Sequence, residues 1–151
     1  DAQKVEVADP ADVQLKNCLA DPELGGFIPQ WIPEEMQLNY AAVYYQLDSE
    51  TGKETGTRQI MMDYTSPDNT GQTVSIIICR ADETGEFAWL GPVYQGELSV
   101  DMITKYLPDF PEQDSFELGV QFGDVIVGLW GWNIDAETIL KIFESVSVKN
   151  S

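Results

Sequence analysis

The sequence contains no histidine and only two cysteines, Cys18 and Cys79, among its 151 residues. Without histidine there is no base for a Ser/His/Asp or Cys/His arrangement, so these classes of nucleophilic enzyme are excluded. A structural zinc site is excluded as well, because two thiols without an imidazole cannot supply four nitrogen or sulfur ligands. Both cysteines stand beside apolar residues, which leaves two states open: a disulfide formed in an oxidising compartment, or two buried free thiols.

Basic residues are also scarce, since eight Lys and Arg stand against 26 Asp and Glu and give a formal net charge of −18. Such a surface repels phosphate backbones and anionic lipid headgroups, so we expect no binding of nucleic acid and no direct membrane contact by this segment. The longest apolar run, 74–79, is far shorter than the roughly 20 residues of a membrane-spanning helix. The segment starts with acidic residues, so no signal peptide is expected in it. No glycine loop has a phosphate-binding spacing, and we expect no cofactor and no metal.

Several stretches have the composition or the alternation of β-strands, and polar turns separate them. They are residues 37–47, 58–66, 73–81, 116–122 and 125–132. Glycine-containing polar loops join the first three in succession, which is typical of an antiparallel meander. Gly123 and Asp124 suit a tight hairpin between the last two.

Three helices are expected around these strands. The first is capped by Asp9, continues through Pro10 and ends near Ala20. Its expected buried residues are Val13, Leu15, Cys18 and Leu19. The second covers 98–107, with Ser99 as its N-cap. The third follows an Asp135 cap and carries one apolar stripe of Ile139, Ile142, Phe143 and Val146. This order predicts an α+β fold, an antiparallel β-sheet with helices packed on it and an amphipathic helix at the C-terminal end.

Trp130 and Trp132 are two residues apart on an expected strand and therefore project to one face, together with Gly128. They could form the lid of a core beneath the last helix, which needs a nearby apolar surface, or a platform for a sugar or peptide. We favour the lid. If the protein binds a ligand, the candidate site is a cleft rimmed by tryptophans, of which at least two are expected in the core. The candidate ligand-binding residues are Trp31, Trp89, Trp130 and Trp132.

Carboxylates are so numerous that adjacent pairs carry little information. Glu34–Glu35 and Asp82–Glu83 could in principle perform acid–base chemistry on glycosides, but solvated turn residues explain them. Asp63, Asp68 and Asn69 stand close together without the regular spacing of a calcium loop, and turn chemistry explains the last two. No catalytic residue is therefore predicted.

Two motifs resemble a known family. "FIPQWIPEEMQLNYA", residues 27–41, is similar to the proline-bounded entry into the first strand of the domain of unknown function 4367. "VIVGLWGWNIDAETILKIFESV", residues 125–146, resembles its ending, where a tryptophan-bearing strand precedes a capped helix. The length of the chain predicts a single domain over 1–151. The resemblance covers the two ends of 27–148, so we expect an N-terminal helical segment at 1–26 and a family-like α+β core at 27–148.

The resemblance implies an extracytoplasmic C-terminal domain of an anti-sigma-factor-like protein of Gram-positive bacteria, and no catalytic residues. We therefore expect a non-enzymatic sensing or protein-interaction domain of an envelope regulatory protein, excised from a full-length chain that a transmembrane helix anchors. Its expected partner is a protein or a cell-envelope ligand. The alternative is a secreted carbohydrate-binding or carbohydrate-active protein that uses exposed tryptophans and a carboxylate pair, and a third is a Ca²⁺-stabilised adhesion module.

Overall fold

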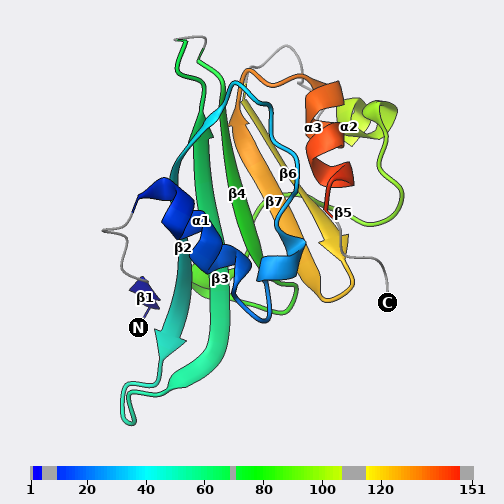
Figure 1. Cartoon of the computed structure of the whole chain (residues 1–151). Helices are drawn as coiled ribbons and strands as arrows, with labels where there is room; N and C mark the ends of the chain where they lie inside the picture. Colours follow the sequence, from blue (N-terminus) through cyan, green and yellow to red (C-terminus); the bar gives the residue numbers. More distant parts are fainter. Residues whose placement is uncertain (1, 5–9, 69–70, 107–114, 147–151) are drawn as a thin grey trace.

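The computed structural model describes residues 2–4, 10–68, 71–106 and 115–146, and they form one seven-stranded sheet with helices on it (Figure 1). The strands are β1 (Ala2–Lys4), β2 (Gln37–Leu47), β3 (Glu54–Thr65), β4 (Thr73–Arg80), β5 (Val93–Tyr94), β6 (Ser115–Phe122) and β7 (Val125–Trp132). Their order across the sheet is β1-β2-β3-β4-β7-β6-β5. Every neighbouring pair is antiparallel except β5 with β6. The predicted α+β fold is confirmed.

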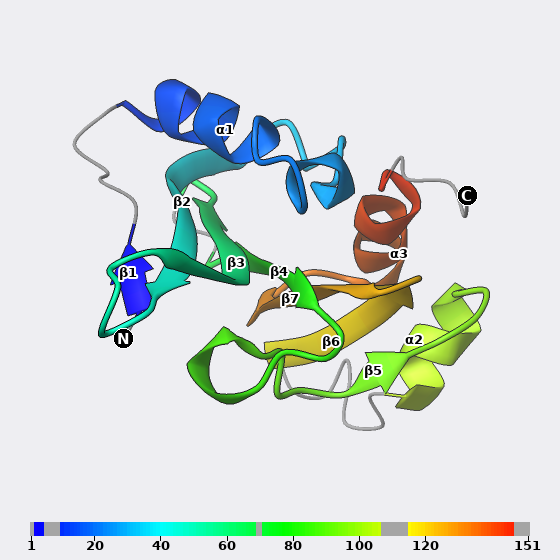
Figure 2. The ribbon, with the colours of Figure 1, turned by 90° about the horizontal axis from the view of Figure 1, so that it is seen from below.

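The helices are α1 (Ala11–Leu19), α2 (Val100–Tyr106) and α3 (Ala136–Glu144), with short 3-10 turns η1 (Gly25–Phe27) and η2 (Gly85–Phe87). One face of the sheet, called the inner face below, is covered by α1, by the segment 20–36 and by α3 (Figure 2). Every second residue of the central strands projects there. The fully buried side chains of this core include Ile60, Met62, Val74, Ile76, Ile78, Leu118, Val127 and Leu129. Burial of each large side chain contributes roughly 1.5–3 kcal/mol, so this layer is the main source of stability.

The C-terminal helix follows its predicted pattern. The Asp135 carboxylate accepts a hydrogen bond from the Thr138 backbone N–H at 2.8 Å, so the predicted N-cap is confirmed. All four residues of the predicted stripe are buried: Ile139, Ile142, Phe143 and Val146. At α2 the Ser99 hydroxyl accepts from the Met102 N–H at 3.2 Å, which confirms the other predicted cap in the described residues.

The first helix is rotated relative to the prediction. Cys18 is buried and Leu15 packs against the core, as predicted, but Val13 and Leu19 are exposed. Gln14 is buried in their place. The rotation is explained by the outer edge of β2. Among the described residues, β1 pairs with this edge only at residues 44–46. There the side-chain Oε1 of Gln14 accepts from the backbone N–H of Ala41 at 2.8 Å, so a polar side chain completes the hydrogen bonding of the strand. The predicted cap at Asp9 lies outside the described residues.

The two cysteines are free thiols in the structure. Cys18 belongs to the core on the inner face, whereas Cys79 packs with Trp89 and Ile126 on the other, outer face. The sheet lies between the two thiols. Of the two states that the sequence left open, the structure therefore contains the buried free thiols.

Candidate binding surface

The four tryptophans do not rim one cleft. Trp31 lies on the inner side, where the Lys141 ammonium sits 4.2 Å from the centre of its ring. Its backbone N–H donates to the hydroxyl of Ser145 at 3.0 Å, which ties the proline-containing segment to the end of α3. The other three tryptophans belong to the outer side of the sheet or to the loop that crosses it. The prediction of one cleft rimmed by all four residues is therefore wrong.

Trp89 is a core residue of the outer face. Its ring lies directly over Gly128 and Gly119, and a Cβ at Gly128 would come within 2.2 Å of the ring carbon Cε3. The indole N–H donates to the carbonyl oxygen of Pro92 at 3.0 Å, which satisfies the polar edge of the ring. The loop around η2 thus covers the outer face over one part of the sheet (Figure 2).

Trp130 and Trp132 are exposed to solvent, at 40% and 52% of their surface. They share the outer face with Gly128, as the strand period requires. The helix α3 nevertheless packs on the inner face, because the chain reverses at Asn133, a non-glycine residue with a φ of 59°. The apolar surface that α3 covers is formed by the alternate residues of β7, such as Leu129. The prediction that the two tryptophans are a core lid is therefore wrong.

Polar side chains flank both indoles across the sheet. In the strand register Trp130 lies between Ser75 and Glu117, and Trp132 lies between Thr73 and Ser115. On β3, Asp63 and Thr65 continue these rows, and on β2 Tyr40 and Gln37 end them. We call this set the tryptophan face; it comprises Gln37, Tyr40, Asp63, Thr65, Thr73, Ser75, Ser115, Glu117, Trp130 and Trp132.

Hydrogen bonds hold part of the tryptophan face in place. The Ser75 hydroxyl donates to the Asp63 carboxylate at 2.7 Å. The hydroxyls of Tyr40 and Tyr44 lie 2.6 Å apart along β2. None of the ten residues is Lys or Arg, and two are acidic, so the face carries negative charge around two apolar rings. Such a surface suits a cationic or an uncharged partner.

The tryptophan face does not assemble a glycosidase-type carboxylate pair. Asp63 and Glu117 stand in the same row but three strand spacings apart, which is about 14 Å between their backbones. Glycosidases need their two carboxyl groups within about 10 Å. Of the other candidates, Glu34 and Glu35 are both exposed, as expected of turn residues.

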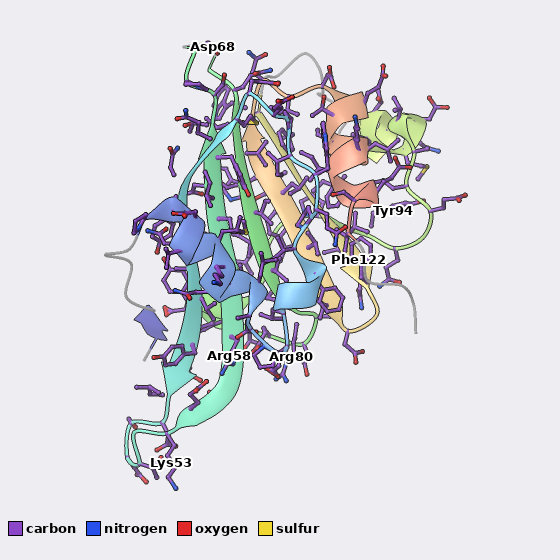
Figure 3. All side chains as sticks on the ribbon, in the orientation of Figure 1. Lys53, Arg58, Asp68, Arg80, Tyr94 and Phe122 are labelled. Atoms are coloured by element: carbon purple, nitrogen blue, oxygen red, sulfur yellow. The ribbon has the colours of Figure 1, made fainter. Side chains whose placement is uncertain are left out.

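The remaining acidic pair belongs to a group of ion pairs at one end of the sheet. Asp82 and Glu83 lie 3.6 and 3.7 Å from the Arg80 Nε. Arg80 and Arg58 emerge beside each other at this end (Figure 3), and Glu23 contacts both guanidinium groups. These carboxylates are therefore paired with arginines.

The carboxylates of the stretch that could have bound calcium, Asp63 and Asp68, do not converge on a common point either. Asp63 is engaged with Ser75, and Asp68 accepts from the Ser66 hydroxyl at 2.5 Å, as in a turn. Asn69 lies outside the described residues. Within the part of the chain that the structure describes, no group of three His, Cys, Asp or Glu side chains could hold a metal ion.

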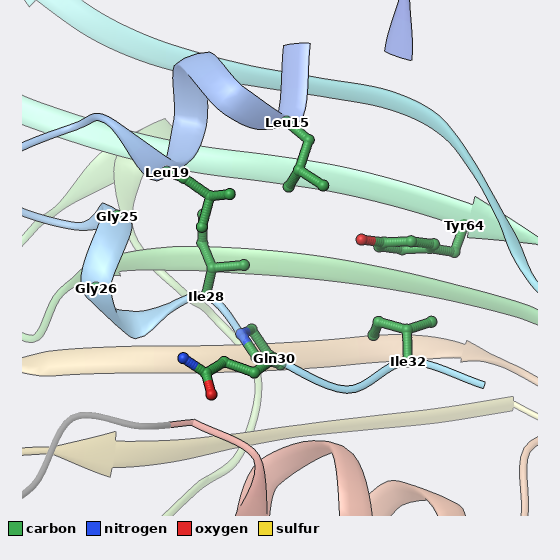
Figure 4. Close-up of a pocket in the computed structure, with 9 residues that line it drawn as sticks. Leu15, Leu19, Gly25, Gly26, Ile28, Gln30, Ile32 and Tyr64 are labelled. Carbon is green, nitrogen blue, oxygen red and sulfur yellow. The ribbon is translucent and has the colours of Figure 1, made fainter. Parts of the chain in front are cut away.

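A pocket between α1, the segment 25–32 and β3 was missed by the sequence analysis. Its volume is about 550 Å³, and it lies on the inner side of the sheet, away from the tryptophan face (Figure 4). The pocket depends on the rotation of α1, which leaves Leu19 exposed at its rim. The rotation itself depends on the bond between Gln14 and Ala41, which no sequence pattern reports.

Comparisons of the chain with protein-family models, with curated proteins and with solved structures found no match. Among the described residues, no helix combines the length and the apolarity that a membrane span requires.

Proposed function

We propose that this protein is a non-enzymatic binding domain that recognises a partner protein through the tryptophan face. The observation that carries the proposal is the exposure of Trp130 and Trp132 on one face of β7, a strand that is paired on both sides. Exposed indoles cost solvation free energy unless a partner covers them, and tryptophan is enriched among the residues that dominate binding energies. β4 and β6 pair with β7 along its whole length, so the backbone that carries the two rings is fixed before any partner arrives.

The charge of the surface selects the class of partner. The face contains the carboxylates of Asp63 and Glu117, and the whole chain carries a net charge of −18. A partner segment with Lys or Arg side chains would gain from these carboxylates and from cation–π contact with the indole rings. Nucleic acids and anionic lipid surfaces would be repelled, in agreement with the low content of basic residues.

The cellular setting of the proposal comes from the resemblance to the domain of unknown function 4367. It supports an extracytoplasmic sensing or interaction domain of a bacterial envelope regulatory protein, anchored by a membrane helix outside this segment. The acidic surface supports the same setting, because a high net charge keeps an exposed domain soluble.

The test is selection of binders from a library of displayed random peptides at low and physiological salt. We expect enrichment of peptides that combine Lys or Arg with an apolar residue, and an affinity that falls as salt rises. Replacing both tryptophans, W130A/W132A, should weaken a selected peptide at least thirtyfold, the effect of about 2 kcal/mol at a dominant contact. The control is V13A, which removes an exposed apolar side chain from α1 on the opposite side of the sheet. Equal binding by both variants would contradict the proposal.

A second candidate is a carbohydrate-binding domain without catalysis. It is favoured by the alternation of indole rings with hydroxyl-bearing neighbours, Thr73, Ser75 and Ser115, since sugars present apolar faces edged by hydroxyl groups. Titration with uncharged chito- and cello-oligosaccharides separates the two candidates. Saturable binding that is insensitive to salt and lost in W130A/W132A would establish this second function and replace the first.

A further inference from the structure

The pocket on the inner side has the size and lining of a small-molecule site. Its volume of about 550 Å³ lies within the range of roughly 300–1,000 Å³ that such sites occupy. Apolar side chains from two separate segments form most of its wall, and Leu19 stands at its rim with 52% of its surface exposed. The full lining is Leu15, Leu19, Gly25, Gly26, Ile28, Pro29, Gln30, Ile32 and Tyr64.

One polar group points into this apolar space from the sheet. The hydroxyl of Tyr64 is directed towards Leu15 and the middle of the pocket (Figure 4). Within the described residues no hydrogen bond of this hydroxyl is present, and the ring is partly buried against the core. Burial, and secondarily the neighbouring Cys18, raise the pKa of Tyr64 to about 12. The hydroxyl is therefore protonated at physiological pH and available as a donor.

The walls of the pocket are preformed. Gly25 lies so close to the end of α1 that a Cβ would come within 2.4 Å of the Leu19 carbonyl oxygen. The Gly25 N–H also donates to the carbonyl oxygen of Asp21 at 3.0 Å. These contacts fix the angle between α1 and the segment after it, so a ligand would meet a cavity that already exists and would lose little affinity to rearrangement.

We infer that this pocket binds an uncharged, mostly apolar small molecule that offers an oxygen acceptor to the Tyr64 hydroxyl. No lining residue is charged, so neither an anionic nor a cationic head group would find a counter-ion there, and burying an unpaired charge is costly. A carbonyl, ether or hydroxyl oxygen satisfies the tyrosine, and an aliphatic or alicyclic body fills the remaining space. The site is separate from the tryptophan face, so it stands or falls independently of the proposed function.

The test uses three probes with the same chain length: 2-nonanone, nonanoate and nonylammonium. We expect 2-nonanone to raise the melting temperature of the protein and to saturate in isothermal titration, because it binds the folded state. The two charged probes should bind at least tenfold more weakly. No binding of 2-nonanone at millimolar concentration, or equal binding of nonanoate, would overturn the inference.

Two variants locate the binding. Y64F keeps the ring and removes the donor, and it should weaken 2-nonanone about twofold to tenfold, the value of one neutral hydrogen bond. L19W places a larger side chain at the rim and should reduce binding at least tenfold. L90W is its control, because Leu90 is an exposed residue beyond the other face of the sheet. Circular dichroism establishes that each variant is folded. Unchanged affinity in L19W would place the probe elsewhere and overturn the assignment.

Discussion

Arg58, on β3, is ion-paired with Asp21, which lies in the turn after α1. Only 2% of the Asp21 side chain is exposed, and its carboxylate also accepts the backbone N–H groups of Glu23 at 3.2 Å and Leu24 at 2.9 Å. One carboxylate thus satisfies two backbone N–H groups of the turn after α1 and joins this turn to the sheet. The same contact holds the segment that forms one wall of the inner pocket.

We expect the substitution Asp21→Ala to destabilise the protein by about 2–4 kcal/mol. It leaves the Arg58 guanidinium without its buried partner and removes the acceptor of two backbone N–H groups. The measurement is urea unfolding at pH 7. Glu54→Gln is the control, since Glu54 pairs with the same arginine but is exposed, and its loss should cost less than about 1 kcal/mol. Equal effects of the two changes would contradict the structural role of Asp21.

The three tryptophans on the outer side of the sheet should separate into one structural residue, Trp89, and two surface residues, Trp130 and Trp132. Trp89→Ala should cost about 3–5 kcal/mol, because it opens a cavity over Gly128. Trp130→Ala and Trp132→Ala should each change the free energy of unfolding by less than about 1 kcal/mol, since both rings are exposed. Chemical denaturation measures the three values. A large loss in Trp130→Ala would restore the view that this ring covers a core.

Gly128→Ala should destabilise the protein through the ring above it. The added Cβ would lie 2.2 Å from a ring carbon of Trp89, so the ring must shift at a cost of about 1–3 kcal/mol or more. If the ring is the cause, Gly128→Ala should cost much less in a Trp89→Leu background. The double-mutant cycle measures this coupling, and strict additivity would show that the cause lies elsewhere.

Stability should fall as the pH rises from about 9 to about 11. Burial raises the pKa of Cys18 and of Cys79 from 9.0 to about 11. Asp21 adds to the rise of the pKa at Cys18; at Cys79 a hydrogen bond with the Trp89 backbone opposes the rise and Glu83 adds to it. Below pH 9 the thiols are protonated in both states and have no effect. Between the two values the unfolded chain has released protons that the folded protein still holds, so unfolding becomes easier.

Equilibrium unfolding at intervals of half a pH unit measures this loss. Replacing Cys18 by Ala and Cys79 by Val should flatten the decline between pH 9 and 11. If the variant without the two thiols loses as much stability between pH 9 and 11 as the unchanged protein does, the thiols are not responsible for the decline. Tyr64, whose pKa is raised from 10.0 to about 12, contributes to the decline in the same direction at higher pH and remains in this variant.

The sequence by itself determined the elements that have long, regular patterns. Burial on one face imposes a period of two on a strand and of 3.6 on a helix. This period predicted the bounds of the strands at 37–47 and 125–132 and the buried residues of the last helix. The caps at Ser99 and Asp135 were also readable, since they depend on contacts three residues away. The two shortest strands, β1 and β5, carry no measurable period and were missed.

Only the tertiary structure decided which face each element covers. Trp130 and Trp132 share a face by local geometry, but the choice of the opposite face for α3 depends on the chain reversal at Asn133 and on the loop that already places Trp89 on the outer side. The rotation of α1 likewise follows from a hydrogen bond between residues 27 positions apart. The period of a strand or helix shows that one side is buried, but the identity of the neighbour depends on contacts between distant segments, and these decided that the two tryptophans face solvent.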